Sequence, residues 1–127
     1  MHTERKHAVI VVVDDEPGIR SLFEMILSRL GHTVSCAVSV SDGLVACAAA
    51  RPDVVIVDMV MPGGNGLGLI HALRGTTPSP RIIAISGGGT EKGFDLLLKA
   101  REAGADVTLR KPVPMDLIVE VVEGLLH

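Results

Sequence analysis

The sequence predicts an α/β fold, namely a doubly wound, five-stranded parallel sheet with strand order 2-1-3-4-5 and five helices. Five short apolar segments alternate along the chain with segments whose apolar residues recur at helical spacing. Two of the apolar segments, 7–13 and 53–60, are rich in valine and isoleucine, which is typical of parallel strands covered on both faces. Because the chain has 127 residues and is 47% hydrophobic, we expect 1–127 to fold as a single domain.

The first strand and helix are marked at both ends. Valine dominates the segment 7–13 until Asp14 interrupts it. Pro17 suits the first position of a helix, because that position needs no backbone N–H. Leucine, isoleucine and phenylalanine then recur at helical spacing as far as Leu30, and Gly31 is a suitable residue to end the helix. The sequence therefore predicts a strand over 7–13 and a helix from Pro17 to Leu30.

Four further units repeat this pattern. The remaining strands are predicted at 33–38, 53–60, 81–86 and 107–110. The helices that follow them are predicted from Ser39 or Ser41 to about Ala50, from about Gly66 to Arg74, from about Phe94 to Ala103, and from near Pro114 to the end of the chain. Pro52 and Gly104 end the second and fourth of the five helices.

The composition argues against several classes of function. The net charge is −3 and aromatic residues make up 2%, which disfavours nucleic-acid binding and adsorption to anionic membranes. The first apolar run is too short for a secretory signal or a membrane span, so we expect a cytoplasmic protein. Cys36 and Cys47 lack metal-ligand spacing and are expected to be small buried thiols. The histidines also lack such spacing and are expected at the surface: His2, His7, His32, His71 and His127.

Polar residues stand where the predicted strands end. Asp14 and Asp15 follow the first strand, Asp58 lies near the end of the third, Ser86 ends the fourth and Lys111 follows the fifth. The carboxyl ends of parallel strands meet at one edge of a sheet, and this edge is where such folds bind ligands. We therefore expect a crevice at this edge that holds three carboxylates at close range.

Three neighbouring carboxylates repel one another unless a cation neutralises them. Mg²⁺ prefers oxygen ligands and keeps several waters, so it leaves room for phosphate oxygens. A carboxylate such as Asp58 beside that cation can attack phosphorus and form an acyl phosphate. In this arrangement Lys111 supplies a positive charge and Ser86 a hydroxyl donor.

The same residues carry a family resemblance. From about Ala8 to Leu126 the chain resembles the CheY-like receiver domains of two-component response regulators, which have a flavodoxin-like fold. The segment 58–66 is similar to the family's D-x-x-M-P-x-x-x-G phosphorylation loop. The acidic pair and Ser86 stand where the family has its acidic pair and its switch Ser/Thr. The Lys111-Pro112 pair is similar to a pair whose peptide bond is usually cis in the family.

The resemblance implies roles for individual residues. Asp58 is the phosphoacceptor, and it binds Mg²⁺ or Mn²⁺ together with the Asp15 side chain and the backbone carbonyl of Val60, whereas Asp14 acts mainly through water. A histidine kinase or a His-containing phosphotransfer protein donates the phosphoryl group. The domain catalyses this transfer to itself and also the later hydrolysis. The chain is therefore not expected to be an enzyme that turns over a separate substrate.

The resemblance also concerns the output. The family usually has an aromatic residue where this chain has Thr108, so signal transfer is expected to rely on inward movement of the glycine-rich loop 87–93 by Ser86. An unknown downstream protein or a second copy is expected on the face formed by the fourth helix, the fifth strand and the fifth helix. In the last helix the apolar arc is wider than one core face needs, which fits either deep burial or an exposed patch.

Two alternatives belong to other classes. A haloacid-dehalogenase-type phosphatase carries its nucleophile in a D-x-D motif after the first strand, whereas here the two aspartates are adjacent. A pseudo-receiver, which binds partners without phosphorylation, usually lacks an acidic residue or the lysine, and this chain has all of them. The resemblance fits a stand-alone regulator and the receiver part of a longer regulator equally.

Overall fold

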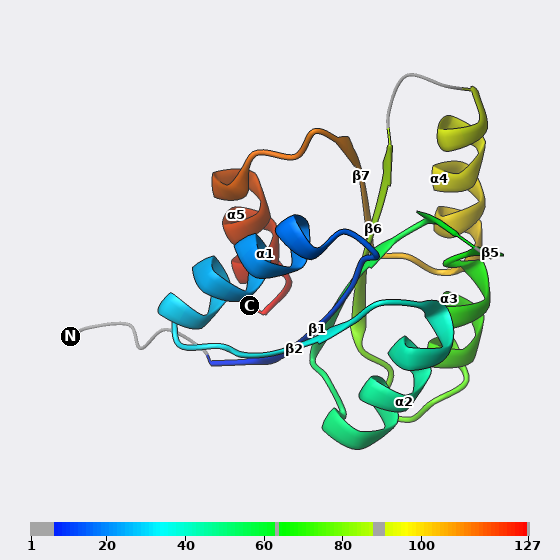
Figure 1. Cartoon of the computed structure of the whole chain (residues 1–127). Helices are drawn as coiled ribbons and strands as arrows, with labels where there is room; N and C mark the ends of the chain where they lie inside the picture. The colour runs from blue at the N-terminus through cyan, green and yellow to red at the C-terminus, as the bar shows by residue number, and fades with distance from the viewer. Residues whose placement is uncertain (1–6, 63, 88–90, 127) are drawn as a thin grey trace.

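A computed structural model describes residues 7–62, 64–87 and 91–126 of the chain. The described residues form seven strands and five helices (Figure 1). The strands are β1 (Val9–Val13), β2 (Thr33–Ala37), β3 (Val54–Asp58), β4 (Val60–Met61), β5 (Gly64–Asn65), β6 (Arg81–Gly87) and β7 (Val107–Lys111). The helices are α1 (Pro17–Arg29), α2 (Val40–Ala50), α3 (Leu67–Arg74), α4 (Glu91–Ala103) and α5 (Met115–Leu125).

The five longer strands form one parallel sheet in the order β2-β1-β3-β6-β7. When these five strands are counted along the chain, the order is 2-1-3-4-5, so the predicted fold class is confirmed. β1 and β3 are in register at their ends, where Val13 pairs with Val57. Their carboxyl ends therefore lie side by side at the centre of one sheet edge.

Helices cover both faces of the sheet (Figure 1). α1 and α5 pack on one face, where Phe23 and Ile118 meet Ile83 of the sheet. α2, α3 and α4 pack on the other, where Cys47 and Leu69 meet alternate residues of the same strands. Burial on both faces explains why β1 and β3 consist almost entirely of aliphatic residues.

The two cysteines differ in their surroundings. Cys47 is buried, as expected, whereas Cys36 is only half-buried. Partial burial raises the pKa of the Cys36 thiol to about 11, and a hydrogen bond to the Glu24 carboxylate adds to this increase. Both cysteines are free thiols.

The expected surface position of the histidines is wrong for His32. This residue is 4% exposed, and its Nδ1 accepts a hydrogen bond of 3.1 Å from the backbone N–H of Ala8. The imidazole thereby satisfies a backbone donor at the point where the chain enters β1, which is a physical reason for its burial. His7 and His71 are exposed, and His2 and His127 lie outside the described residues.

Some element boundaries also differ from the expected ones. The third predicted strand, 53–60, stops at Asp58, and the chain then forms the short antiparallel hairpin β4–β5. α4 begins at Glu91, three residues before the expected start at Phe94. Two-residue strands are too short to give a periodic pattern, so the hairpin left no signal in the sequence.

The amino edge of the sheet is tied together by one arginine. Nε of Arg74 in α3 donates to the carbonyl of Gly104 at 2.8 Å, and its Nη1 donates to the carbonyl of Pro80 at 2.7 Å. Its Nη2 pairs with Asp106 Oδ2 at 2.8 Å, and the same oxygen accepts the N–H of Ile82 at 2.7 Å. This network fixes the starts of β6 and β7, at the edge opposite the predicted crevice.

The structure answers the question left open for α5. Ile118 and Val122 are fully buried, whereas Leu117 is 37% exposed and Leu125 is half-buried. The wide apolar arc is thus partly covered, mainly by α1 and the sheet.

Among the described residues, no helix has both the length and the apolar character that a membrane span requires.

Candidate functional site

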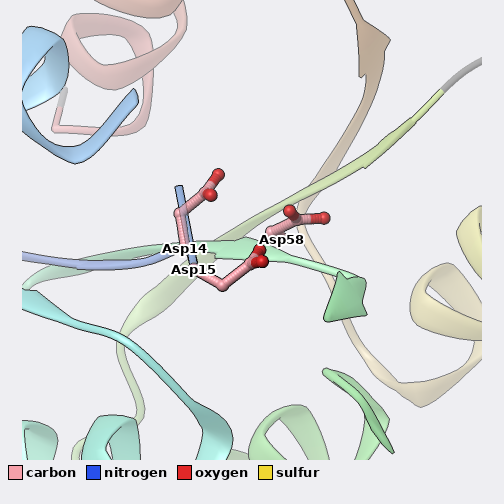
Figure 2. A group of neighbouring side chains, drawn as sticks. All are labelled: Asp14, Asp15 and Asp58. Carbon is pink, nitrogen blue, oxygen red and sulfur yellow. The ribbon is translucent and has the colours of Figure 1, made fainter. Parts of the chain in front are cut away.

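Three carboxyl groups meet at the carboxyl edge of the sheet (Figure 2). Asp14 and Asp15 follow β1, and Asp58 is the last residue of β3. One oxygen from each of them lies within 4.8 Å of the others. Asp14 and Asp58 are buried and Asp15 is half-buried, so the cluster is shielded from bulk water on the protein side.

Backbone and side-chain hydrogen bonds hold Asp14 in place. Its N–H donates to the carbonyl of Ala37 at 3.1 Å, at the end of the β1–β2 pairing. Its Oδ1 accepts the N–H of Glu16 at 2.9 Å, which closes the turn into α1. Its carbonyl accepts a hydrogen bond of 2.8 Å from Nη1 of Arg20. Three hydrogen bonds therefore hold Asp14 in position at the end of β1.

Asp58 is held by the loop that follows it. Its Oδ1 accepts the N–H of Val60 at 3.0 Å. The phosphorylation-loop motif 58–66 ends at Gly66. Glycine suits this position because a Cβ on Gly66 would lie 2.9 Å from both Met59 Sδ and Val57 Cγ2. Any larger residue would therefore require the Met59 and Val57 side chains or the loop to shift. The motif thus fixes the backbone on both sides of the carboxylate.

Lys111 provides the positive charge of the site. Its Nζ lies 3.0 Å from Asp58 Oδ2, 3.4 Å from Asp14 Oδ2 and 3.8 Å from Glu16 Oε1. The residue ends β7 and pairs in register with Gly87 at the end of β6. The following peptide bond, Lys111-Pro112, is cis, as the family resemblance implied.

Burial and charge shift the pKa values of this pair. Burial raises the pKa of Asp58, and the hydrogen bonds from Val60 and Lys111 offset only part of that increase. Burial lowers the pKa of Lys111, but its hydrogen bond and charge interaction with Asp58, together with the charges of Asp14 and Glu16, raise it above its usual value. At neutral pH Lys111 is therefore charged, and in the metal-free protein it is the counter-ion of the carboxylates.

A prediction about stability follows from the raised pKa of Asp58. The folded, metal-free protein binds a proton at Asp58 more readily than the unfolded chain does, so protonation of this group stabilises the folded state. This contribution grows as the pH falls from neutral towards the ordinary pKa range of an aspartic acid side chain. Urea unfolding in EDTA is expected to show the wild type gaining stability relative to Asp58→Asn over this range. A constant difference between the two proteins would contradict the prediction.

Ser86 lies next to the carboxylates on the neighbouring strand. It follows Ile85, which is the register partner of Asp58, and its side chain is fully buried. Among the described residues its Oγ has no hydrogen-bond partner. A buried hydroxyl without a partner is unfavourable, so this position suits a ligand oxygen at the edge of the sheet.

The donor set fits a hard divalent cation. Carboxylate oxygens without nitrogen or sulfur ligands are what Mg²⁺ and Mn²⁺ take in proteins, with water in the remaining positions. Asp14, Asp15 and Asp58 are placed to hold such an ion. That the backbone carbonyl of Val60 is a further metal ligand stays a prediction.

Two residues at the site were not anticipated from the sequence. Arg20 donates to the carbonyl of Asp14, and Glu16 approaches Lys111. Both lie in or next to the first turns of α1, so their closeness to the acidic pair in sequence was the signal available.

The predicted movement of the loop 87–93 falls partly outside the described residues, because 88–90 are not among them. Thr108 is half-buried in β7 and pairs with Ala84.

A doubly wound sheet with this acidic edge and its lysine defines a response regulator receiver domain. The family model with that description matches residues 10–123, and the chain belongs to this family. The recognition made from the sequence motifs is thereby confirmed.

Individual relatives agree with this membership. The chain is 38% identical over 120 residues to the DNA-binding transcriptional regulator NtrC of Azospirillum brasilense, covering 94% of this chain and 24% of the relative. It is 32% identical to the crystal structure of the receiver domain of NtrX from Brucella abortus, with a TM-score of 0.82 and coverage of 92% and 97% of the two chains. The BeF3-activated DrrB receiver domain is 25% identical, with a TM-score of 0.82 and coverage of 95% and 98%. The chain also spans 30% and 44% of two further curated relatives, a protein-glutamate methylesterase of Myxococcus xanthus and the regulator AfsQ1 of Streptomyces coelicolor.

Proposed function

We propose that this chain relays a signal by accepting a phosphoryl group on Asp58. The observation that carries the proposal is the position of the Asp58 carboxylate, which is buried at the end of β3, lies 3.0 Å from the Lys111 ammonium and shares an oxygen-lined space with Asp14 and Asp15. Such a site offers a nucleophilic oxygen, room for a cation and a fixed positive charge, which are the requirements of phosphoryl transfer.

The donor in this proposal is a phosphohistidine of a histidine kinase or a phosphotransfer protein. One oxygen of Asp58 attacks the phosphorus, a P–O bond forms, and the P–N bond to the histidine breaks with its electron pair going to the imidazole. Lys111 stabilises the negative charge of the phosphoryl oxygens, and the unpartnered hydroxyl of Ser86 donates to one of them. A cation held by Asp14, Asp15 and Asp58 supplies further charge neutralisation when it is bound.

The same site limits what the domain does. Attack of water on the phosphorus returns Asp58 to its free form and releases inorganic phosphate, so the chemistry begins and ends on the protein itself. We infer that the chain is a self-modifying switch and does not turn over a separate substrate.

Phosphorylation is tested by incubating the protein with acetyl phosphate and Mg²⁺ and measuring its intact mass. We expect a gain of one phosphoryl group, no gain in EDTA and no gain for Asp58→Asn. The matched control is Asp116→Asn, which changes an exposed carboxylate in the first turn of α5 and is expected to leave the gain unchanged. An equal gain in Asp58→Asn would refute the assignment of the phosphoacceptor.

We further propose that the output surface is formed by α4, β7 and α5, for binding a downstream protein or for dimerisation. Exposed apolar side chains support this, namely Leu98 on α4 at 47% and Leu117 on α5 at 37% exposure. Since Thr108 offers no aromatic ring in β7, the proposed link from the phosphate to this surface is Ser86 and the loop after it. Size-exclusion chromatography with and without beryllofluoride tests whether modification changes association through this face.

A further inference from the structure

α2 has an unusual composition for a helix on the outside of a domain. Its residues 43–50 carry no charge, and they are apolar around the whole circumference. Gly43 and Cys47 are buried against the sheet, which accounts for one side of the helix. A helix that is apolar all round is normally covered on all sides, yet the other side of α2 faces solvent in this structure.

The exposed side forms what we call the α2 patch, which consists of Leu44, Val45, Ala48 and Ala49. These residues lie on one side of the helix because Leu44 and Ala48, and likewise Val45 and Ala49, are four positions apart and so neighbours on the helix surface. Val45 is 71% exposed, more than any other large exposed hydrophobic residue that the structure describes, and Leu44 is 39% exposed. Exposed apolar clusters of this kind mark interaction surfaces.

The pattern of large and small residues in the α2 patch is self-complementary. The two large residues lie in the first half and the two alanines in the second. If a second α2 packs antiparallel about a two-fold axis between positions 46 and 47, Leu44 faces Ala49 and Val45 faces Ala48 of the other copy. Large side chains then meet small ones in every pair, which permits close helix packing.

The charges at the ends of the helix follow the same symmetry. Asp42 lies in the first turn and Arg51 is the C-cap residue, and both are exposed. An antiparallel pair brings Asp42 of one copy to the end of the helix that carries Arg51 of the other, whereas a parallel pair would place like charges together. It also places helix ends of opposite partial charge near each other. This charge complementarity favours a second copy over an unrelated partner.

The helix is held firmly enough to present such a surface. A Cβ on Gly43 would lie 3.0 Å from Cγ2 of Val13, so α2 lies very close to β1. Beside the α2 patch is a groove of about 450 Å³ between α2 and the β4–β5 hairpin, where Leu44, Met61 and Pro62 are among the lining residues. Leu44 belongs to both the α2 patch and this groove, so the α2 patch borders the loop that follows Asp58.

We propose that the chain forms a homodimer through the α2 patch, with the two α2 helices antiparallel about a two-fold axis. This surface lies on the opposite side of the sheet from α5 and is separate from the proposed output face. The proposal does not depend on phosphorylation, so the association is measured in EDTA without a phosphoryl donor.

The test is sedimentation velocity of the full chain over about 10–500 µM, a range in which weak specific dimers are populated. We expect the wild type to dimerise and Val45→Glu to be monomeric, with a dissociation constant raised at least about tenfold, because a charge would be buried without a partner. The matched control is Met25→Glu, which makes the same kind of change at an exposed residue of α1, 46% exposed, and is expected to leave the dimer intact.

A charge exchange tests the antiparallel arrangement. Asp42→Arg and Arg51→Asp are each expected to weaken the dimer, and the double variant to restore it. The proposal is overturned if the wild type is monomeric throughout, if Met25→Glu separates the dimer while Val45→Glu does not, or if the double variant remains as weak as the single ones. Circular dichroism checks that each variant is folded, which the exposure of the replaced side chains favours.

Discussion

Replacement of Lys111 by methionine is expected to destabilise the metal-free protein by about 3 kcal/mol, because it removes the counter-ion of carboxylates that stay buried. Asp14 and Asp58 are 4% and 3% exposed at their side chains, and the Lys111 ammonium lies within 3.4 Å of both. Methionine retains much of the aliphatic stem, so the change mainly removes charge. Phosphorylation by acetyl phosphate is expected to slow about 100-fold, since a fixed charge on the phosphoryl oxygens is lost.

Mg²⁺ provides a second readout for this variant. A bound cation neutralises the same carboxylates, so the loss of stability in Lys111→Met should become smaller at saturating Mg²⁺ than in EDTA. Urea unfolding in both conditions measures the difference. The control is Lys99→Met, which changes an exposed lysine of α4 and should have little effect on stability or rate. A Lys111→Met protein as stable as the wild type in EDTA would show that the carboxylates do not need this counter-ion.

Replacement of Ile83 by alanine is expected to destabilise the protein by about 2–5 kcal/mol. Ile83 lies in β6, an interior strand of the sheet, is 0% exposed and packs in the cluster formed by α1, α5 and the sheet. Its neighbours are aliphatic chains from β1, β3 and α5, which are already closely packed and cannot fill the cavity fully. For a domain with about 5–15 kcal/mol of total stability, this change approaches the limit of folding.

The cavity explanation has its own control. Ile83→Val removes one methylene group and should lower stability by about 0.5–1.5 kcal/mol, measured by urea denaturation at the same pH. Similar losses for valine and alanine would mean that the cost arises from something other than cavity volume. Neither variant should change phosphorylation of Asp58 while the protein remains folded.

Much of the fold could be predicted because local and global signals agree. The valine-rich β1 and β3 contain little that suits an exposed surface, and the strand order places them at the centre of the sheet. Helix ends were marked by Pro17 and Gly104. The β4–β5 hairpin could not be predicted, because its pairing depends on how the loop packs after Asp58 and not on any periodic pattern.

The meeting of the acidic residues could be expected from topology alone. Side chains at the ends of neighbouring parallel strands must share one edge, whatever their distance in sequence. What topology could not supply was the set of contacts that depend on side-chain reach. Lys111 extends to Glu16 as well as to the aspartates, and Arg20 turns back to the carbonyl of Asp14.

His32 and α2 show a further limit of sequence patterns. A single polar residue between a helix and a strand looks like a surface residue, whereas in the structure His32 is buried and accepts the N–H of Ala8. The apolar stretch 43–50 fits a helix, but composition alone does not say which side of that helix faces solvent. The exposure of Val45 became visible only when the sheet had a defined position beside it.

The long chain separation of the charged groups has a consequence for the order of assembly. Lys111 is 97 residues from Asp14 and 53 from Asp58, so the three groups meet only when the last strand has joined the sheet. Contacts of such separation form late, because the loops between them must first be closed. Until then the aspartates are carboxylates without their counter-charge. The charged site is therefore complete only when β7, which carries Lys111, has joined the sheet.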